Sequence, residues 1–225
     1  MRRPKNVLIG ISLATVLACC PVFAQDDYEK INSNLAMSIS APLNPTAQYV
    51  QLGWGSTGGA GYNFNSHHST IVEFGWNRVY PTNGVLQPLR AAAQTQDITG
   101  RSDLYSLTGN YRFELRGREF GTYFIGGGGL YHRTTNLSKP VASGTSTTCT
   151  PPWIWWGFSC ESGIVTSDQQ IASASSTALG ANAGIGFTAR VGEAPYRLYV
   201  ESRYHYAPTK NVSTQLLVIS FGIRY

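Results

Sequence analysis

The amino-acid sequence predicts an all-β fold, and three observations support this prediction. Apolar residues alternate with polar or small residues along many segments, which is the two-residue period of a β-strand. The chain contains 24 glycines and 13 tyrosines, a composition typical of twisted strands and the turns between them. The last segment, 212–225, is apolar at every second position from residue 217 onward. Together these features favour a chain made mainly of strands.

The two-residue period occurs in eight segments, most of them near or above the roughly nine to eleven residues that a tilted strand needs to cross a bilayer. The expected strands are 34–41, 54–64, 69–79, 103–114, 120–133, 175–190, 196–207 and 213–225. The short, polar connections are 65–68, 114–119 and 191–195. The long connections are 42–53, 80–102 and 134–174. An even number of strands with short and long connections in alternation predicts an eight-stranded antiparallel transmembrane β-barrel.

The two faces of the expected strands support the membrane prediction. In 196–207, Arg197, Glu201 and Arg203 share one face, whereas Leu198 and Val200 lie on the other. A soluble sandwich would turn the apolar face inward, but charged residues are better placed in a closed, polar interior when lipid surrounds the protein. The chain is 42% apolar, and no stretch after residue 24 is long and apolar enough to span a bilayer as a helix.

The last strand has the strongest pattern. Its apolar face would meet lipid, and its terminal aromatic residue would lie in the interfacial girdle. This face resembles the C-terminal assembly signal of bacterial outer-membrane proteins, which usually ends in Phe or Trp rather than Tyr. The residues of this expected signal are Leu217, Ile219, Phe221, Ile223 and Tyr225. The alternative is an edge strand of a soluble sandwich.

The first residues predict export. Residues 1–5 are basic, 7–16 form a short apolar run, and 22–24 offer small residues for cleavage after Ala24. We therefore expect a signal peptide at 1–24, a short periplasmic segment at 25–33 and the barrel at 34–225. Lipoprotein processing at Cys19 is a weaker alternative, because Leu17 fits a lipobox poorly.

Several segments resemble the small OmpA-like barrels grouped as the outer membrane protein beta-barrel domain family, and the resemblance covers the whole mature chain. The matching segments are 59–64, 123–131, 201–206 and 221–225. The resemblance implies an eight-stranded barrel in the outer membrane of a Gram-negative envelope, with both termini in the periplasm and the long loops outside. No peptidoglycan-binding domain is expected after the barrel, so a wall-tethering role is not predicted.

Charged residues are expected to gather in the lumen of this barrel. Isolated charges would be costly in a confined interior, so acids and arginines there should form hydrogen-bonded pairs. Two interpretations follow: a structural plug of ion pairs, which we favour, or a gate in a narrow conduction path. The expected lumenal residues are Glu73, Arg112, Arg197, Glu201, Arg203, His205 and Arg224.

Glycines at alternate positions are expected to face the same lumen. An eight-stranded barrel has a narrow interior, and a small residue leaves room for a large side chain opposite. The glycines assigned to the lumen are Gly55, Gly59, Gly61, Gly126, Gly128, Gly180, Gly184 and Gly186.

Cys149 and Cys160 remain as a pair once the signal peptide is removed, and export places them where disulfides form. A bond between them would close a small loop and restrict it by roughly 3 kcal/mol on the chain-entropy estimate. The loop between them is rich in aromatic residues, which can anchor a protein partner or a glycan, or pack on the barrel rim. These residues are Trp153, Trp155, Trp156 and Phe158.

Enzyme, metal and nucleotide sites are not predicted. Residues 203–207 are similar to the His-x-Ser segment of lipid A deacylases, and His205 would match the base. Ala207, however, stands where the nucleophilic serine is required. The glycine pattern at 53–58 lacks a surrounding βαβ unit, and the histidines form no ligand pair of metal-site spacing. We therefore expect no catalytic residue and no cofactor.

The sequence as a whole predicts a non-enzymatic integral outer-membrane barrel with a structural or surface-interaction role. A narrow, porin-like pore is the first alternative, and a lipid A-modifying enzyme is the second. The net charge of +5 includes three positive residues of the signal segment, which leaves about +2 and no basis for nucleic-acid binding. The expected partners are outer-membrane lipid, the barrel assembly machinery and an extracellular partner or glycan bound through 149–160.

Overall fold

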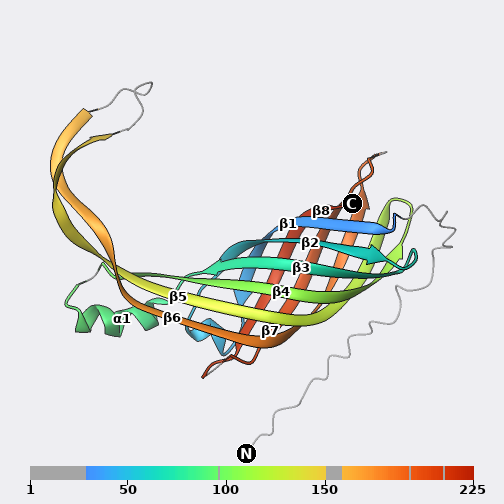
Figure 1. Cartoon of the computed structure of the whole chain (residues 1–225), viewed down its shortest axis with the longest axis horizontal. Coiled ribbons are helices and arrows are strands. Elements are labelled where there is room, and N and C mark those ends of the chain that lie inside the picture. Colours follow the sequence, from blue (N-terminus) through green and yellow to red (C-terminus); the bar gives the residue numbers. More distant parts are fainter. Residues whose placement is uncertain (1–28, 96, 151–158, 193, 210) are drawn as a thin grey trace, which may run out of the picture.

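A computed structural model describes residues 29–95, 97–150, 159–192, 194–209 and 211–225. Within these residues, antiparallel strands close into an eight-stranded barrel in the order of the sequence (Figure 1). The strands are β1 (Ile31–Pro42), β2 (Gly53–Asn63), β3 (His68–Val79), β4 (Thr99–Arg116), β5 (Phe120–Thr150), β6 (Ser159–Arg190), β7 (Arg197–Ala207) and β8 (Thr214–Arg224). The predicted fold class is therefore confirmed.

The barrel closes where β8 pairs with β1. Met37 of β1 lies opposite Phe221 of β8, and the antiparallel register runs from Asn34 to Pro42. The backbone of Tyr225 continues this pairing, because its N–H donates to the Ser33 carbonyl and its carbonyl accepts from the Ser33 N–H. Closure leaves no open edge along this seam, and an open edge would leave backbone groups unsatisfied in lipid.

The inside and outside of the barrel have the polarity expected of a membrane protein. Side chains alternate along β4 so that Thr108, Asn110 and Arg112 are buried in the lumen, while Leu107 and Tyr111 are exposed on the outer surface. Leu35 and Phe74 on β1 and β3 are likewise 61% and 54% exposed. Apolar side chains point outward around the wall, as contact with hydrocarbon requires.

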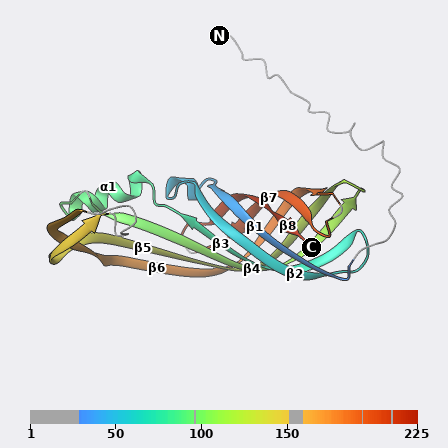
Figure 2. The same cartoon turned by 90° about the horizontal axis from the view of Figure 1, so that it is seen from above.

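The two ends of the barrel differ. At one end, which we call the terminal end, the C-terminus lies close to residue 29, since the Tyr225 hydroxyl donates to the Glu29 carboxylate over 3.3 Å. The opposite end, the hairpin end, carries α1 (Asn83–Ala92) and η1 (Thr46–Gln48) (Figures 1 and 2). None of the helices in the described part of the chain has the length and apolar character needed to cross a membrane.

The longest strands, β5 and β6, continue well past the barrel at the hairpin end. The β4–β5 ladder ends at the pair Thr99–Ser138, and the β6–β7 ladder ends at Ala181–Tyr206. β5 and β6 nevertheless remain paired with each other as far as Thr150–Ser159. They form a curved two-stranded ribbon that leaves the barrel beside α1 (Figure 1). We call residues 139–150 and 159–169 the β5–β6 ribbon.

The ribbon shows that one sequence-based expectation was wrong. Residues 134–174 were expected to form a long loop, but only 151–158 lie outside the described residues, and the rest is strand. The error has a physical reason: Ser and Thr are the commonest residues of both arms, so there is no apolar alternation by which to recognise a strand. β1 also begins at Ile31, three residues before the expected start of the barrel at 34.

Two glycines of β5, Gly126 and Gly128, were expected to face the lumen but lie on the other face of the strand. Tyr123 and Tyr131 are buried in the lumen, so Gly127 and Gly129 point inward, and Gly126 and Gly128 point outward. A Cβ at Gly127 would collide with Asn110 of the neighbouring strand. Four successive glycines do not indicate which face of the strand is polar. The alternation between inward and outward positions therefore has to be counted from the flanking tyrosines.

Candidate functional site: a charged lumen and the cavity at its mouth

The centre of the lumen is an arginine held between two carboxylates. Arg203 on β7 lies 2.6 Å from Glu73 on β3 and 2.6 Å from Glu201 on its own strand. Residues 201 and 203 share a face because side chains repeat every two residues, and β3 brings Glu73 from across the barrel. All three side chains are at most 5% exposed. The ion pairs are therefore fully enclosed by protein.

Neutral groups donate further hydrogen bonds to the carboxylates of this cluster. The side-chain amides of Asn34 and Asn110 each donate to Glu73 over 2.6 Å. The hydroxyl of Tyr123 donates to Glu201 over 2.8 Å. Buried charges are tolerated only when both the charge and its hydrogen-bonding capacity are matched, and these donors supply that second condition.

A second cluster lies closer to the terminal end and is built around Glu114. Arg224 on β8 and Arg112 on β4 approach this carboxylate at 3.4 and 3.7 Å, and Arg116 approaches it at 3.5 Å. The guanidinium carbon of Arg224 also lies 4.3 Å from the ring centroid of Tyr123. An aromatic face attracts a cation, so this ring links the second cluster to the first.

The buried acids and arginines of the two clusters differ from the predicted ones in two residues. Glu114 was expected in a polar turn at 114–119, but β4 extends through Arg116, and the two-residue period carries Glu114 inward after Arg112. Arg197 lies at the rim, where its guanidinium donates to the main-chain carbonyls of Gly117 and Glu119. Three buried glutamates thus face three buried arginines in the described lumen: Glu73, Glu114, Glu201, Arg112, Arg203 and Arg224.

The remaining predicted lumenal residue, His205, also faces inward but belongs to neither cluster. Its Nδ1 lies 3.0 Å from the hydroxyl of Tyr131, and the two rings meet edge to face at 5.9 Å. Ala207, two residues further along β7, is buried on the same face. The structure therefore places these two residues inside the barrel, away from the lipid-facing surface.

Close packing leaves little free space beside the cluster around Arg203. The cavity bordered by Glu73, Glu201 and Arg203 has a volume of about 10 Å³, which is at the lower limit for one water molecule. Tyr123 fills part of the lumen because its partner-strand neighbour is Gly186, where any Cβ would collide with the tyrosine ring. The small residue opposite the large one is the arrangement that a narrow barrel requires.

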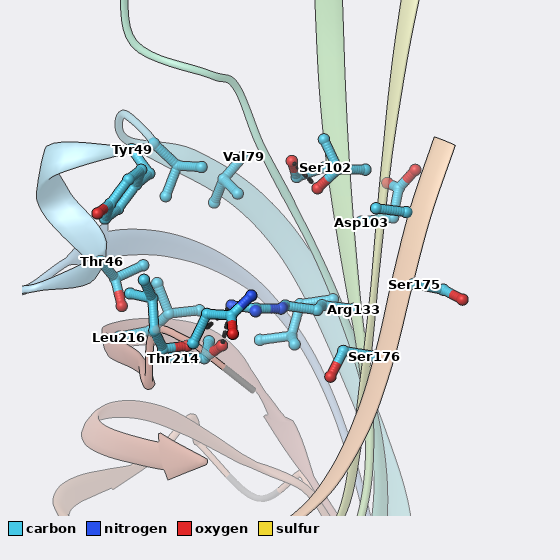
Figure 3. A pocket seen from close by; sticks show the side chains of 16 residues that line it. Thr46, Tyr49, Val79, Ser102, Asp103, Arg133, Ser175, Ser176, Thr214 and Leu216 are labelled. Carbon is cyan, nitrogen blue, oxygen red and sulfur yellow. Dashed lines mark hydrogen bonds between the residues drawn. The ribbon is translucent and has the colours of Figure 1, made fainter. Parts of the chain in front are cut away.

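A larger cavity, of about 420 Å³, opens at the hairpin end of the same lumen (Figure 3). Val79, Leu104 and Leu216 contribute apolar side chains to its lining, as does Tyr49 from the segment after η1. Arg133 of β5 reaches across it, and one Nη donates to the Val212 carbonyl and to the Thr214 hydroxyl. No pattern in the sequence indicates this cavity, because its lining comes from segments far apart in the chain.

The structure describes some of the other predicted site residues but not all of them. Cys149 and Cys160 are direct partners in the β5–β6 register, although their disulfide stays a prediction. The aromatic residues between them lie outside the described residues, as does the whole signal segment with Cys19 and Ala24. The expected assembly-signal residues alternate outward along β8, ending at Tyr225.

Metal ligands do not cluster in the described part of the chain: no group of three or more His, Cys, Asp or Glu side chains there could hold an ion. His68 instead contacts the hydroxyl of Tyr111, and His132 bonds to Thr177 over 2.7 Å. These contacts belong to the wall of the barrel rather than to a binding site.

A closed antiparallel barrel with an apolar exterior and a paired, charged interior defines an integral outer-membrane protein. The chain belongs to the family described as "Outer membrane protein beta-barrel domain", whose profile matches residues 11–225. This match confirms the resemblance inferred from the sequence and places the protein in the outer membrane. No curated protein matches the chain.

Solved structures of other small barrels are similar to this one. The attachment invasion locus protein Ail of Yersinia pestis is 18% identical, with 87% of this chain and 96% of that chain covered and a TM-score of 0.45. OprG from Pseudomonas aeruginosa is 13% identical, with 87% and 95% covered and a TM-score of 0.43. The N-terminal barrel domain of OprF from the same organism is 14% identical, with 88% and 98% covered and a TM-score of 0.40. The family assignment rests on the sequence match rather than on these likenesses.

Proposed function

We propose that the protein is a non-enzymatic outer-membrane barrel with a closed lumen, and that it acts through the surface presented at its hairpin end. The observation that carries this proposal is the pairing of Arg203 with both Glu73 and Glu201 across the lumen. A path for ions would have to break these buried pairs, because the space beside them is only about 10 Å³. The chemistry of the interior thus supports a wall rather than a channel.

The proposed orientation puts the hairpin end outside the cell and both termini in the periplasm. Outer-membrane barrels have short turns on the periplasmic side and longer extracellular segments. The connections at the terminal end, 64–67 and 117–119, are short, whereas α1 and the β5–β6 ribbon lie at the other end. The C-terminal strand would then present its apolar face to the barrel assembly machinery from the periplasm.

The β5–β6 ribbon is the feature best suited to surface interaction. Its two strands leave the barrel together and stay paired as far as Thr150 and Ser159 (Figure 1). Cys149 and Cys160 are paired in register, and an antiparallel pair has the Cα separation that a disulfide needs. A disulfide there would fix the aromatic segment as a constrained tip, the kind of surface that binds a protein or a glycan.

Specific observations argue against the two alternative functions. A narrow pore would need a continuous path, which the ion pairs of Arg203 obstruct. A lipid A-modifying enzyme would need a nucleophile beside His205 on the lipid side. The ring of His205 faces the lumen, and Ala207 supplies no hydroxyl.

Removing the ribbon tests the proposal directly. Ser138 and Gln170 are Cα partners, so replacing residues 139–169 by an Asn-Gly turn should reconnect β5 and β6 without disturbing the barrel. We expect this variant to stay folded and to lose binding on glycan arrays and on cell-surface proteins relative to the parent protein. Equal binding by both proteins would contradict the role of the ribbon. A large, steady single-channel conductance of the parent would favour the pore instead.

A further inference from the structure

We propose that the terminal end of the lumen is a binding site for a phosphate group, which is held by a row of arginines across β6, β7 and β8. The row consists of Arg190, Arg197 and Arg224. It lies at the end of the barrel opposite the β5–β6 ribbon, so the site does not depend on the function proposed for the ribbon (Figure 1). The ligand is free phosphate or the phosphate of a lipid headgroup.

The three arginines of the row are direct cross-strand neighbours. Arg197 of β7 is the Cα partner of Arg190 on β6 and of Arg224 on β8. Each of them lies an even number of residues from a buried lumenal residue of its own strand, so all three belong to the inner face of the wall. Like charges directly opposite each other destabilise a sheet. Negative charge placed beside this row therefore stabilises the barrel.

Two more arginines approach the row from β4. Arg112 and Arg116 lie on the inner face on either side of Glu114. Arg197 reaches toward them, because its guanidinium donates to two main-chain carbonyls of the 117–119 turn over 3.3 and 3.2 Å. The side chain of Arg116 is 28% exposed. The group thus extends from the packed lumen to its terminal mouth, where solvent reaches it.

Glu114 is the carboxylate that lies within ion-pair distance of this group. It accepts a hydrogen bond from Arg224 over 3.4 Å, while the Nε atoms of Arg112 and Arg116 lie 3.7 and 3.5 Å from its oxygens. Hydrogen bonds between a guanidinium and a carboxylate are ordinarily about 2.7–2.9 Å long. A single carboxylate at these distances leaves the guanidiniums around it with unused hydrogen-bonding capacity.

Several buried guanidinium nitrogens have no hydrogen-bond partner among the described residues. These atoms are Nη1 of Arg112 and the Nε atoms of Arg112, Arg116, Arg197 and Arg224. Arg112 and Arg224 are only 2% and 3% exposed. Buried donors without an acceptor are costly. A phosphate group offers several acceptor oxygens around one centre together with negative charge, and the planar fork of arginine matches it.

The excess positive charge lies at the terminal mouth and not in the packed interior. Arg190 and Arg197 form no ion pair within the part of the chain that the structure describes. The hollow beside Glu114 and Arg116 has a volume of about 10 Å³, which is at the lower limit for one water molecule. The phosphate group therefore sits over the mouth, against Arg116 and Arg197, and the lumen behind it stays closed.

Inorganic phosphate is the probe for the site. The mature protein is refolded in dodecyl maltoside, a detergent without phosphate, and urea unfolding is followed with and without a low phosphate concentration in a constant chloride background. We expect saturable binding of phosphate by calorimetry and a higher unfolding midpoint in its presence, because a ligand of the folded state stabilises that state. The low concentration keeps general salt effects small. Equal midpoints with and without phosphate would overturn the proposal.

A matched pair of variants tests the row. Arg197→Gln removes the central charge and should weaken phosphate binding at least roughly tenfold, because a charge-assisted hydrogen bond contributes about this much affinity. Arg118→Gln is the control, since Arg118 is an exposed arginine of the neighbouring turn outside the row, and it should leave binding nearly unchanged. Equal weakening by the two variants would show general attraction to a basic surface, and the proposal would fail.

A third variant keeps the proposal testable if Arg197→Gln does not fold. Arg190→Glu places a carboxylate directly opposite Arg197, so that a pair of opposite charges replaces a pair of like charges. We expect a higher unfolding midpoint than that of the parent in phosphate-free buffer, and no further increase when phosphate is added. A lower midpoint in phosphate-free buffer would mean that the row does not suffer from repulsion, and would contradict the site.

A lipid arm identifies the source of the phosphate group. The protein is placed in nanodiscs of mixed phosphatidylcholine and phosphatidylglycerol, and the lipids that stay bound after extraction are identified by mass spectrometry. Retention of phosphatidylglycerol by the parent and by Arg118→Gln, but not by Arg197→Gln, supports a lipid headgroup as the ligand. Binding of inorganic phosphate without such retention supports free phosphate. If neither binds the parent, the proposal is overturned.

Discussion

At the residue scale, the stability of the lumen depends on Arg203 having two acidic partners. We expect Glu201→Ala to lower the free energy of unfolding by about 3–5 kcal/mol, because removal of one partner leaves a buried charge less than fully compensated. Tyr123 would lose its acceptor in the same variant, since its hydroxyl donates to Glu201 over 2.8 Å. Urea unfolding in lipid vesicles, followed by gel mobility, measures the change.

The control for this variant is Glu119→Ala, which removes an exposed carboxylate at the terminal end. Surface charges of this kind contribute about 0–1 kcal/mol, so the unfolding midpoint should hardly move. If Glu201→Ala behaves like the control, the carboxylate is solvated and the lumen is not closed at this level.

Gly186 is expected to be intolerant of any side chain for a different reason. A Cβ at this position would collide with the Tyr123 ring, whose hydroxyl anchors Glu201. We expect Gly186→Val to destabilise the barrel by about 1–3 kcal/mol, as overpacking of a closed interior does. Gly109→Val is the matched control on β4, because no atom lies within 4 Å of its Cβ. Urea midpoints that shift equally in both variants would contradict this account.

Most of the charged lumen was predictable from the sequence, and the exceptions have clear causes. Counting every second residue places Glu73, Glu201 and Arg203 on inner faces, because parity is preserved along a regular strand. Glu114 was missed because its polar neighbours resemble a turn, although the same parity from Arg112 would have placed it inside. The cross-barrel contacts of Asn34 and Tyr123 depend on three-dimensional packing and leave no mark in a single strand.

At the scale of elements, β8 closes the barrel and should be required for assembly. Deletion of residues 221–225 removes Arg224 and eight of the twenty residue pairs that β8 makes with β1 and β7. We expect the truncated protein to give no heat-modifiable folded band on unboiled gels, because an unclosed barrel leaves backbone groups unsatisfied in lipid. Replacing α1 by an equal number of Gly and Ser residues is the control and should leave the folded band unchanged. Normal assembly of the truncated protein would refute the role of this segment.

The ribbon leads to a prediction about Cys149 and Cys160. Since the two residues face each other in register, we expect them to be joined in the exported protein and unreactive toward thiol reagents until a reductant is added. Cys149→Ser should change binding at the tip far more than barrel stability, because the ribbon lies beyond the last β4 and β7 pairs. Labelling of either thiol in the intact, unreduced protein would show that the tip is open.

The ribbon also marks the limit of prediction from periodicity. Within the membrane, lipid on one side and a packed lumen on the other force an apolar and a polar residue to alternate. Beyond Ser138 and Gln170 β5 and β6 pair only with each other, and Ser and Thr are the commonest residues of both arms. The strands persist there through their mutual backbone hydrogen bonds, which carry no sequence pattern.

At the scale of the whole molecule, the charges buried in the lumen balance. In the described lumen, three glutamates face three arginines. The sequence-based set was unbalanced because it omitted Glu114 and included Arg197, which lies at the rim. A balanced interior needs no counterion from solution, so a closed lumen is electrostatically stable without a column of water and salt. The architecture and the charge inventory therefore both support the proposal that the barrel does not conduct.

Planar-bilayer recording tests whether the barrel conducts ions. We expect the parent protein to show no steady single-channel conductance, because the cavity beside Arg203 is only about 10 Å³ and the ion pairs around it are enclosed. In Glu201→Ala the lost carboxylate leaves space and an excess of positive charge, so water should enter and any current should be selective for anions. Glu119→Ala, outside the lumen, should remain silent. A large steady conductance in the parent, or a cation-selective current in Glu201→Ala, would mean that Arg203 and its partners line an open path, and the protein would then be a pore.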